Sequence, residues 1–120
     1  SHKKYKQEKA IVLEREEYQI VARPDLCNRY IVVDWKSGRS SGYEQQLQLY
    51  MWVLGERCNT GLLAEVRAEY KEDKVTAVNL FRVKQYERSM YAKDWELKFD
   101  EMANDILSHL KYLNRYLSQL

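Results

Sequence analysis

A chain of 120 residues is long enough for one domain, and we expect a single domain over residues 1–120. Its content of 45% hydrophobic and 32% charged residues is typical of a soluble globular protein. The net charge of +2 is too small to predict nucleic-acid binding by itself, because such binding depends on local clusters of lysine and arginine. Such clusters occur at Lys3, Lys4, Lys6 and Lys9, and at Arg82, Lys84 and Arg88.

Two further features bear on where the protein works. No apolar run reaches the roughly 18 residues of a membrane-spanning helix, and the polar start SHKKYKQEKA lacks the apolar core of a signal peptide. Cys27 and Cys58 are too far apart for a metal-binding pair, and one disulfide between them stays possible. We therefore expect an intracellular protein, and the missing initiator methionine leaves open that it is a fragment of a longer one.

The first third of the chain predicts three strands. β-type runs cover residues 9–14 and 18–22, and the short polar link between them suggests a hairpin. A third strand is expected over residues 29–35, where four apolar or aromatic residues follow one another from Tyr30. Such a continuous run is typical of a central strand that is buried on both faces.

The remainder predicts a loop, two helices and a second hairpin. After a Gly/Ser loop at residues 37–42, a helix is expected over residues 44–57, since apolar residues recur there with helical spacing. Strands at 62–70 and 75–83 would form the second hairpin. Residues 86–120 are helical by the same spacing, with Asp94 as a candidate cap. The order β-β-β-α-β-β-α indicates an α/β fold with a mixed central sheet flanked by helices.

The residues that carry chemistry gather around the third strand. Asp25 follows the only proline, and Asp34 lies at the end of the apolar run. Lys36 shares a strand face with Asp34, because residues two apart point to the same side. Two carboxylates and a backbone carbonyl suit Mg²⁺, and the lysine could orient an attacking water or contact a phosphate. On the helix, Gln46 and Tyr50 are one turn apart and could contact a phosphate or orient the lysine.

This set resembles a known family. Pro24-Asp25, eight residues, and then Asp34-Trp35-Lys36 is similar to the signature of the PD-(D/E)XK nuclease superfamily. The continuation Ser37-Gly38, followed by Gln46-x-x-x-Tyr50, resembles its RecB-type branch. The resemblance covers about residues 18–54.

The resemblance implies a restriction-endonuclease-like core and hydrolysis of DNA phosphodiester bonds in DNA replication, recombination or repair. It implies Mg²⁺ or Mn²⁺ as the cofactor and single- or double-stranded DNA as the substrate. The implied roles are metal ligation by Asp25, Asp34 and the Trp35 carbonyl, catalysis by Lys36, and support or nucleic-acid binding by Gln46, Tyr50 and Ser37. Family members often have a helix with a metal-contacting Glu before the first strand, and Glu8 is the candidate for that role here.

Two alternative functions and the formation of a homodimer stay open. The domain could be a catalytically inactive nucleic-acid-binding or assembly module with the same fold, or an α/β interaction domain without a nucleic-acid role. The apolar stripe of the last helix most simply packs on the sheet, but it could instead form a homodimer. Its residues are Leu110, Leu113, Leu117 and Leu120.

Overall fold

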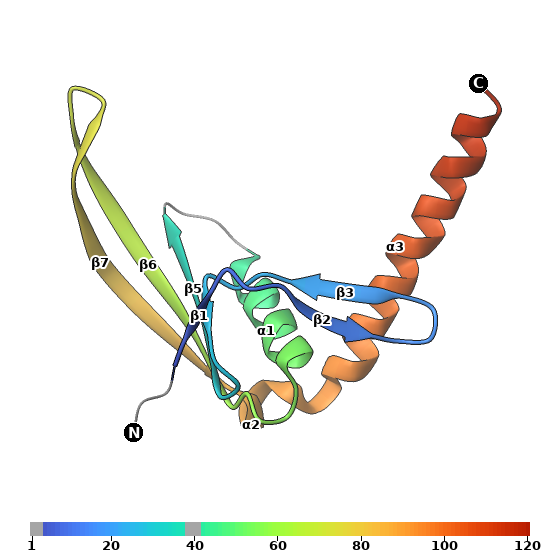
Figure 1. The fold of residues 1–120 in the computed structure, drawn as a ribbon, viewed down its shortest axis with the longest axis horizontal. Coiled ribbons are helices and arrows are strands. Elements are labelled where there is room, and N and C mark those ends of the chain that lie inside the picture. Colours follow the sequence, from blue (N-terminus) through green and yellow to red (C-terminus); the bar gives the residue numbers. More distant parts are fainter. Residues whose placement is uncertain (1–3, 38–41) are drawn as a thin grey trace.

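Five strands form a mixed sheet, and a separate two-stranded hairpin lies beside it (Figure 1). The computed structural model describes residues 4–37 and 42–120. The strands are β1 (Lys6–Gln7), β2 (Ile11–Glu14), β3 (Gln19–Ala22), β4 (Leu26–Cys27), β5 (Ile31–Ser37), β6 (Thr60–Lys71) and β7 (Lys74–Glu87). The helices are α1 (Tyr43–Leu54), α2 (Arg88–Tyr91), the 3₁₀ turn η1 (Ala92–Asp94) and α3 (Trp95–Ser118).

The main sheet has the strand order β1-β4-β5-β6-β7. β5 and β6 are parallel, whereas the other neighbouring pairs are antiparallel. A parallel pair needs a crossover connection, and α1 provides it between β5 and β6. The predicted class, an α/β protein with a mixed sheet and helices, is therefore confirmed, but the predicted order β-β-β-α-β-β-α omitted the two-residue strands β1 and β4.

Helix α1 packs against the sheet through its fully buried side chains Leu47 and Met51. They lie over Gly61 of β6, where an added Cβ would come within 2.7 Å of the Met51 sulfur. The helix ends at Leu54 because Gly55 adopts a positive φ of 95° and donates its N–H to the carbonyls of Met51 and Trp52. The prediction that this helix continues to residue 57 is wrong for this reason.

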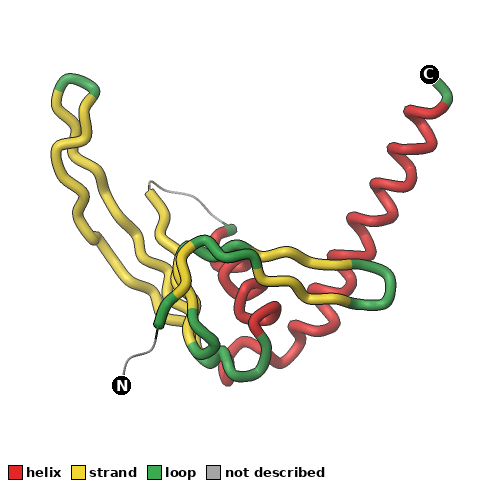
Figure 2. Tube along the Cα trace, in the orientation of Figure 1, coloured by secondary structure: helices red, strands yellow, loops and turns green. Residues whose placement is uncertain are grey.

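The first predicted hairpin is confirmed as β2–β3, but it forms a sheet of its own. It lies against α1 instead of extending the main sheet (Figure 2). Tyr18, just before β3, donates its hydroxyl to Asp100 of α3 at 2.6 Å. The hairpin therefore ties the first half of α3 to the rest of the domain.

The second predicted hairpin is confirmed as β6–β7, and it projects from the body of the molecule (Figure 1). Glu72 and Asp73 form its tip, both with positive φ, as tight two-residue hairpin turns require. β7 continues to Glu87, beyond the predicted end at residue 83, because Glu87 still pairs with Thr60 at the start of β6. Helix begins only at Arg88.

The core centres on an aromatic contact between α1 and α3. The rings of Trp52 and Phe99 lie 5.4 Å apart, and Trp95 packs on Phe99 at 6.4 Å. The indole N–H of Trp95 donates to Gln48 of α1 at 3.0 Å. Beyond this contact α3 leaves the body, and its second half is exposed (Figure 1). Asp94 occupies the N-cap position of α3, but among the described residues its side chain makes no capping hydrogen bond, so the predicted cap is wrong.

β5 occupies the predicted central position, but only one of its faces is fully buried. Val32 and Asp34 are buried, whereas Ile31 and Val33 on the opposite face are partly exposed and Trp35 is 45% exposed. The expectation of burial on both faces is therefore wrong. The reason is that α1 packs on one face of the strand.

The sequence left a disulfide possible and predicted no membrane-spanning helix. Cys27 and Cys58 are buried free thiols rather than a disulfide. Among the described residues, no helix combines the length and the apolar character needed to span a membrane.

Candidate active site

Asp25 and Asp34 are held together by backbone hydrogen bonds that run in both directions. The N–H of Asp25 donates to Oδ1 of Asp34 at 3.0 Å, and the N–H of Trp35 donates to Oδ2 of Asp25 at 3.0 Å. Asp25 lies immediately before β4, which pairs with β5. The two predicted carboxylates therefore meet at one place.

Asp34 is the one buried charged residue in the described part of the chain, with 2% of its surface exposed. Burial raises the pKa of its carboxyl above the usual range, and the neighbouring carboxylate of Asp25 adds to this effect. The Asp25 N–H and the Lys36 ammonium act in the opposite direction. A buried carboxylate next to a second one favours a proton or a cation between them.

Lys36 lies on the same face of β5 as Asp34, as the strand period predicts. Its ammonium is 3.7 Å from Oδ2 of Asp34 and 3.2 Å from Oε1 of Gln46 on α1. It also lies 4.4 Å from the centre of the Tyr43 ring, in a cation–π contact. Contacts to a strand, a helix amide and an aromatic face together fix the position of this ammonium.

Tyr50 completes the helix side of the site. Burial raises the pKa of its phenol, and the carboxylates of Asp34 and Asp25 raise it further. The phenol therefore stays protonated and can donate a hydrogen bond at neutral pH. Tyr50 shares a face of α1 with Gln46, whose amide contacts Lys36.

Tyr43 is a site residue that the sequence reasoning missed. It is the first residue of α1, three positions before Gln46 and seven before Tyr50, so all three share one helix face. That spacing was the signal that could have identified it. An aromatic ring at this position adds to the hold on Lys36 through its cation–π contact.

Trp35 and Ser37 take different positions. The side chain of Trp35 is exposed and points away from the face that carries Asp34, so only its backbone could serve the site. Ser37 is the exposed last residue of β5, paired with Val66. The predicted loop residue Gly38 lies outside the described residues. Glu8 donates its backbone N–H to the carbonyl of Asp25 at 3.3 Å, which brings its backbone beside the first carboxylate.

The basic cluster around β7 is already partnered. Arg82 forms a 2.9 Å ion pair with Glu65, and Lys84 lies 3.3 Å from Glu44. Arg88 instead donates to backbone carbonyls near the end of α1. Within the described residues these three side chains therefore have partners in the fold and do not form an unpaired basic patch.

The described residues contain no group of three or more His, Cys, Asp or Glu side chains that could hold a metal. The side-chain ligands available to a cation at this site are therefore the two carboxylates of Asp25 and Asp34. Mg²⁺ usually takes one or two carboxylates and keeps several waters, so a two-carboxylate site suits it.

Comparison with known proteins adds little. No protein-family model matches this sequence, and no curated protein matches it either. Among solved structures, one described as "Crystal structure of SSO0001" is similar over 63% of this chain, with 23% sequence identity and a TM-score of 0.44. This chain spans 40% of the length of that protein. A likeness of this size carries no argument about fold or function.

Proposed function

We propose that this domain is a Mg²⁺- or Mn²⁺-dependent deoxyribonuclease with a restriction-endonuclease-like core of the RecB type. The observation that carries the proposal is that Asp25, just before β4, is hydrogen-bonded to the Asp34–Trp35 segment of β5, while Lys36 of the same strand lies 3.7 Å from the Asp34 carboxylate. Gln46, which the resemblance also names, contacts Lys36 from the helix side, and Tyr50, the second such residue, lies one turn further along the same helix face. A role in DNA replication, recombination or repair follows from the same proposal.

The donor set supports a divalent cation. Asp25 and Asp34 each use one carboxylate oxygen to accept a backbone N–H. The second oxygen of each could bind a ligand, although that of Asp34 also lies 3.7 Å from the Lys36 ammonium. Their mutual repulsion and the burial of Asp34 favour a cation at this place. The Trp35 carbonyl is the proposed third protein ligand. When bound, the cation would lower the pKa of a water and neutralise charge that develops on the scissile phosphate.

Lys36 is the proposed catalytic residue. Its ammonium is held between the Asp34 carboxylate and the Gln46 amide oxygen. From there it would orient the attacking water or contact the scissile phosphate, and loss of such a group typically lowers a rate by about 10² to 10⁴-fold. The protonated phenol of Tyr50 would donate a hydrogen bond to a phosphate oxygen.

Cleavage of labelled linear and circular DNA, single- and double-stranded, in Mg²⁺ or Mn²⁺ tests the proposal. We expect the wild-type protein to cut, and the Asp34→Ala and Lys36→Ala variants to lose cutting. Lys111→Ala, an exposed lysine on α3, is the matched control and should cut normally.

If the wild-type protein cleaves none of these substrates, the proposed deoxyribonuclease activity is refuted. If the same protein then binds DNA in a salt-dependent way, the inactive nucleic-acid-binding module is the correct function. If it binds no DNA, it is an interaction domain without a nucleic-acid role.

A further inference from the structure

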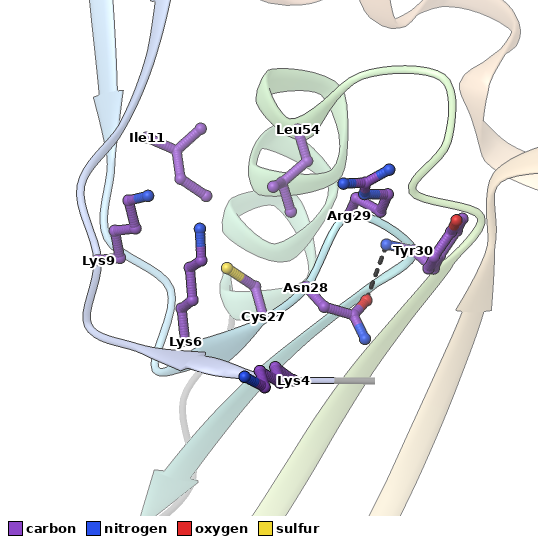
Figure 3. Close-up of a pocket in the computed structure, with 9 residues that line it drawn as sticks. All are labelled: Lys4, Lys6, Lys9, Ile11, Cys27, Asn28, Arg29, Tyr30 and Leu54. Atoms are coloured by element: carbon purple, nitrogen blue, oxygen red, sulfur yellow. Dashed lines mark hydrogen bonds between the residues drawn. The ribbon is translucent and has the colours of Figure 1, made fainter. Parts of the chain in front are cut away.

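A pocket of about 640 Å³ lies beside β4 and the start of β5, and Figure 3 shows the side chains that line it. This size lies within the range of roughly 300–1,000 Å³ that is usual for ligand sites. Cys27, which lines the pocket, pairs with Val32 of β5, so the nearest edge of the pocket lies two strand residues, roughly 7 Å, from Asp34. The pocket is lined by Lys4, Lys6, Lys9, Ile11, Cys27, Asn28, Arg29, Tyr30 and Leu54.

Positive charge dominates the rim of this pocket. Lys4, Lys6, Lys9 and Arg29 are four of its nine described lining residues, and none of the nine is acidic. In the described part of the chain, none of these four cations forms an ion pair with a carboxylate. Lys9 lowers the pKa of Lys6, with a smaller contribution from Arg29, so the charges repel one another. An anion in the pocket would relieve that repulsion.

Asn28 adds a hydrogen-bond donor without a partner. Its Oδ1 accepts the backbone N–H groups of Tyr30 and Ile31 at 2.8 and 2.9 Å, which fixes the orientation of the amide. Its Nδ2 is buried, and among the described residues it has no acceptor. A buried donor without an acceptor is costly, so a ligand oxygen that reached it after a shift of the lining side chains would offset the cost.

The inner wall of the pocket is apolar and carries no opposing charge. Leu54, Ile11 and Cys27 form it between the lysines on one side and Arg29 on the other (Figure 3). Leu54 is the last residue of α1, where exposed carbonyls would repel an anion. The Arg88 guanidinium satisfies the carbonyls of Met51, Gly55 and Cys58 at 2.5–2.8 Å, so this end of the helix is compensated.

We propose that this pocket binds a nucleoside 5′-monophosphate group, either free or at the 5′ end of a nucleic-acid strand. The four cations and the Asn28 amide would hold the phosphate oxygens. The apolar wall and the volume left beside the phosphate accommodate the nucleoside. This binding requires neither the Asp25–Asp34 pair nor nuclease activity.

Fluorescence anisotropy of two decathymidylates labelled at the 3′ end tests this proposal. One carries a 5′-phosphate, the other a 5′-hydroxyl, and EDTA prevents cleavage. We expect the phosphorylated strand to bind at least about tenfold more tightly to the wild-type protein and to Asp34→Asn. Competition by thymidine 5′-monophosphate and by inorganic phosphate then separates the contribution of the nucleoside from that of the phosphate alone.

The variants locate the effect. Lys6→Gln combined with Lys9→Gln, or Arg29→Gln alone, should abolish the preference for the phosphorylated strand. Asn28→Asp keeps the turn-forming oxygen but replaces the free donor by an acceptor, and it should abolish the preference too. The control Lys93→Gln/Lys111→Gln removes two positive charges from exposed positions elsewhere. It should retain the preference for the phosphorylated strand.

Two results would overturn the proposal. One is equal binding of both strands by the wild-type protein. The other is an equal loss of preference in the Lys93→Gln/Lys111→Gln control, which would show that only net charge matters. Thermal unfolding followed by circular dichroism verifies that each variant is folded, which is expected because Lys6, Lys9 and Arg29 are exposed.

Discussion

The amide oxygen of Gln46 on α1 lies 3.2 Å from the ammonium of Lys36 on β5. This hydrogen bond joins the helix to the strand at the candidate site, opposite the Asp34 carboxylate. Under the proposed function Gln46 would be a positioning residue, since it would act through the lysine.

Replacing Gln46 by Leu should lower the single-turnover cleavage rate by about tenfold, equal to roughly 1.4 kcal/mol, and leave Mn²⁺ affinity unchanged. The reason is that Lys36 loses the partner that orients it, while both carboxylates stay in place. Gln46→Glu keeps an oxygen for the lysine and should recover much of the rate. Gln45→Leu, at an exposed neighbouring position, is the control. Loss of Mn²⁺ binding in Gln46→Leu would contradict the positioning role.

Metal binding should stabilise the fold. A ligand at one hundred times its Kd adds about 2.7 kcal/mol to the free energy of unfolding, so saturating Mn²⁺ should raise the Tm and EDTA should reverse the shift. The Asp25→Asn/Asp34→Asn double variant should show no shift, because both carboxylate ligands are gone. The exposed pair Glu101→Gln/Asp105→Asn has the same change in charge and should respond like the wild type. A Tm shift that persists without Asp25 and Asp34 would place the metal elsewhere.

Gly61→Ala should cost about 1–3 kcal/mol of the free energy of unfolding, because the new methyl group would overpack the interface between α1 and β6. Its Cβ would lie 2.7 Å from the Met51 sulfur and 3.2 Å from Leu47. Urea unfolding measures the cost. Adding Met51→Ala removes the nearest obstacle, so the two changes should cost less together than the sum of their separate costs. Simple additivity would mean that the close approach is relieved in another way.

The cysteines should be inert in the folded protein. Burial raises the pKa of Cys58 to about 11 and also raises that of Cys27. At pH 8 we expect neither thiol to react quickly with a disulfide reagent until denaturant is added, when two thiols should react. Fast reaction of the native protein would contradict their burial.

The same shift predicts a pH dependence of stability. The folded-state pKa of Cys58 is above its ordinary value of 9.0, so the stabilising contribution of the neutral thiol is complete below pH 9. It is lost as pH rises from about 9 to about 11. The difference in unfolding free energy between the wild type and Cys58→Ala should therefore shrink across that window. A difference that stays constant with pH would contradict the shift.

The homodimer through α3 stays a prediction, and the exposed stripe on this helix defines its test. Ile106, Leu110, Leu113 and Leu117 follow one another at steps of four, three and four residues, which is the spacing of a coiled-coil seam. All four are exposed. If they pair with a second copy, the wild type should sediment as a dimer and Leu110→Lys/Leu117→Lys as a monomer. Leu97→Lys, at another exposed position of α3, is the control and should leave the dimer intact. A monomeric wild type would contradict the prediction of a homodimer.

Sequence patterns predicted the elements of this protein better than their ends. Apolar spacing depends on local geometry, so it identified β5, α1 and both hairpins. The ends depend on contacts. β5 starts at Ile31 because the Asn28 side-chain oxygen accepts the backbone N–H groups of Tyr30 and Ile31 in a turn. β7 continues to Glu87 because it still pairs with β6 there.

By itself, the sequence determined that Asp34 and Lys36 share a face, because alternation is a property of any strand. It likewise determined that Gln46 and Tyr50 share a face of α1. Only the tertiary structure decided that the Asp25 N–H donates a hydrogen bond to the Asp34 carboxylate and that Lys36 donates one to the Gln46 amide oxygen. These contacts join separate elements. The tertiary structure also decided which basic residues have a carboxylate partner within the described part of the chain. Lys6 and Lys9 line an open pocket, whereas Arg82 has a carboxylate partner that the chain brings beside it.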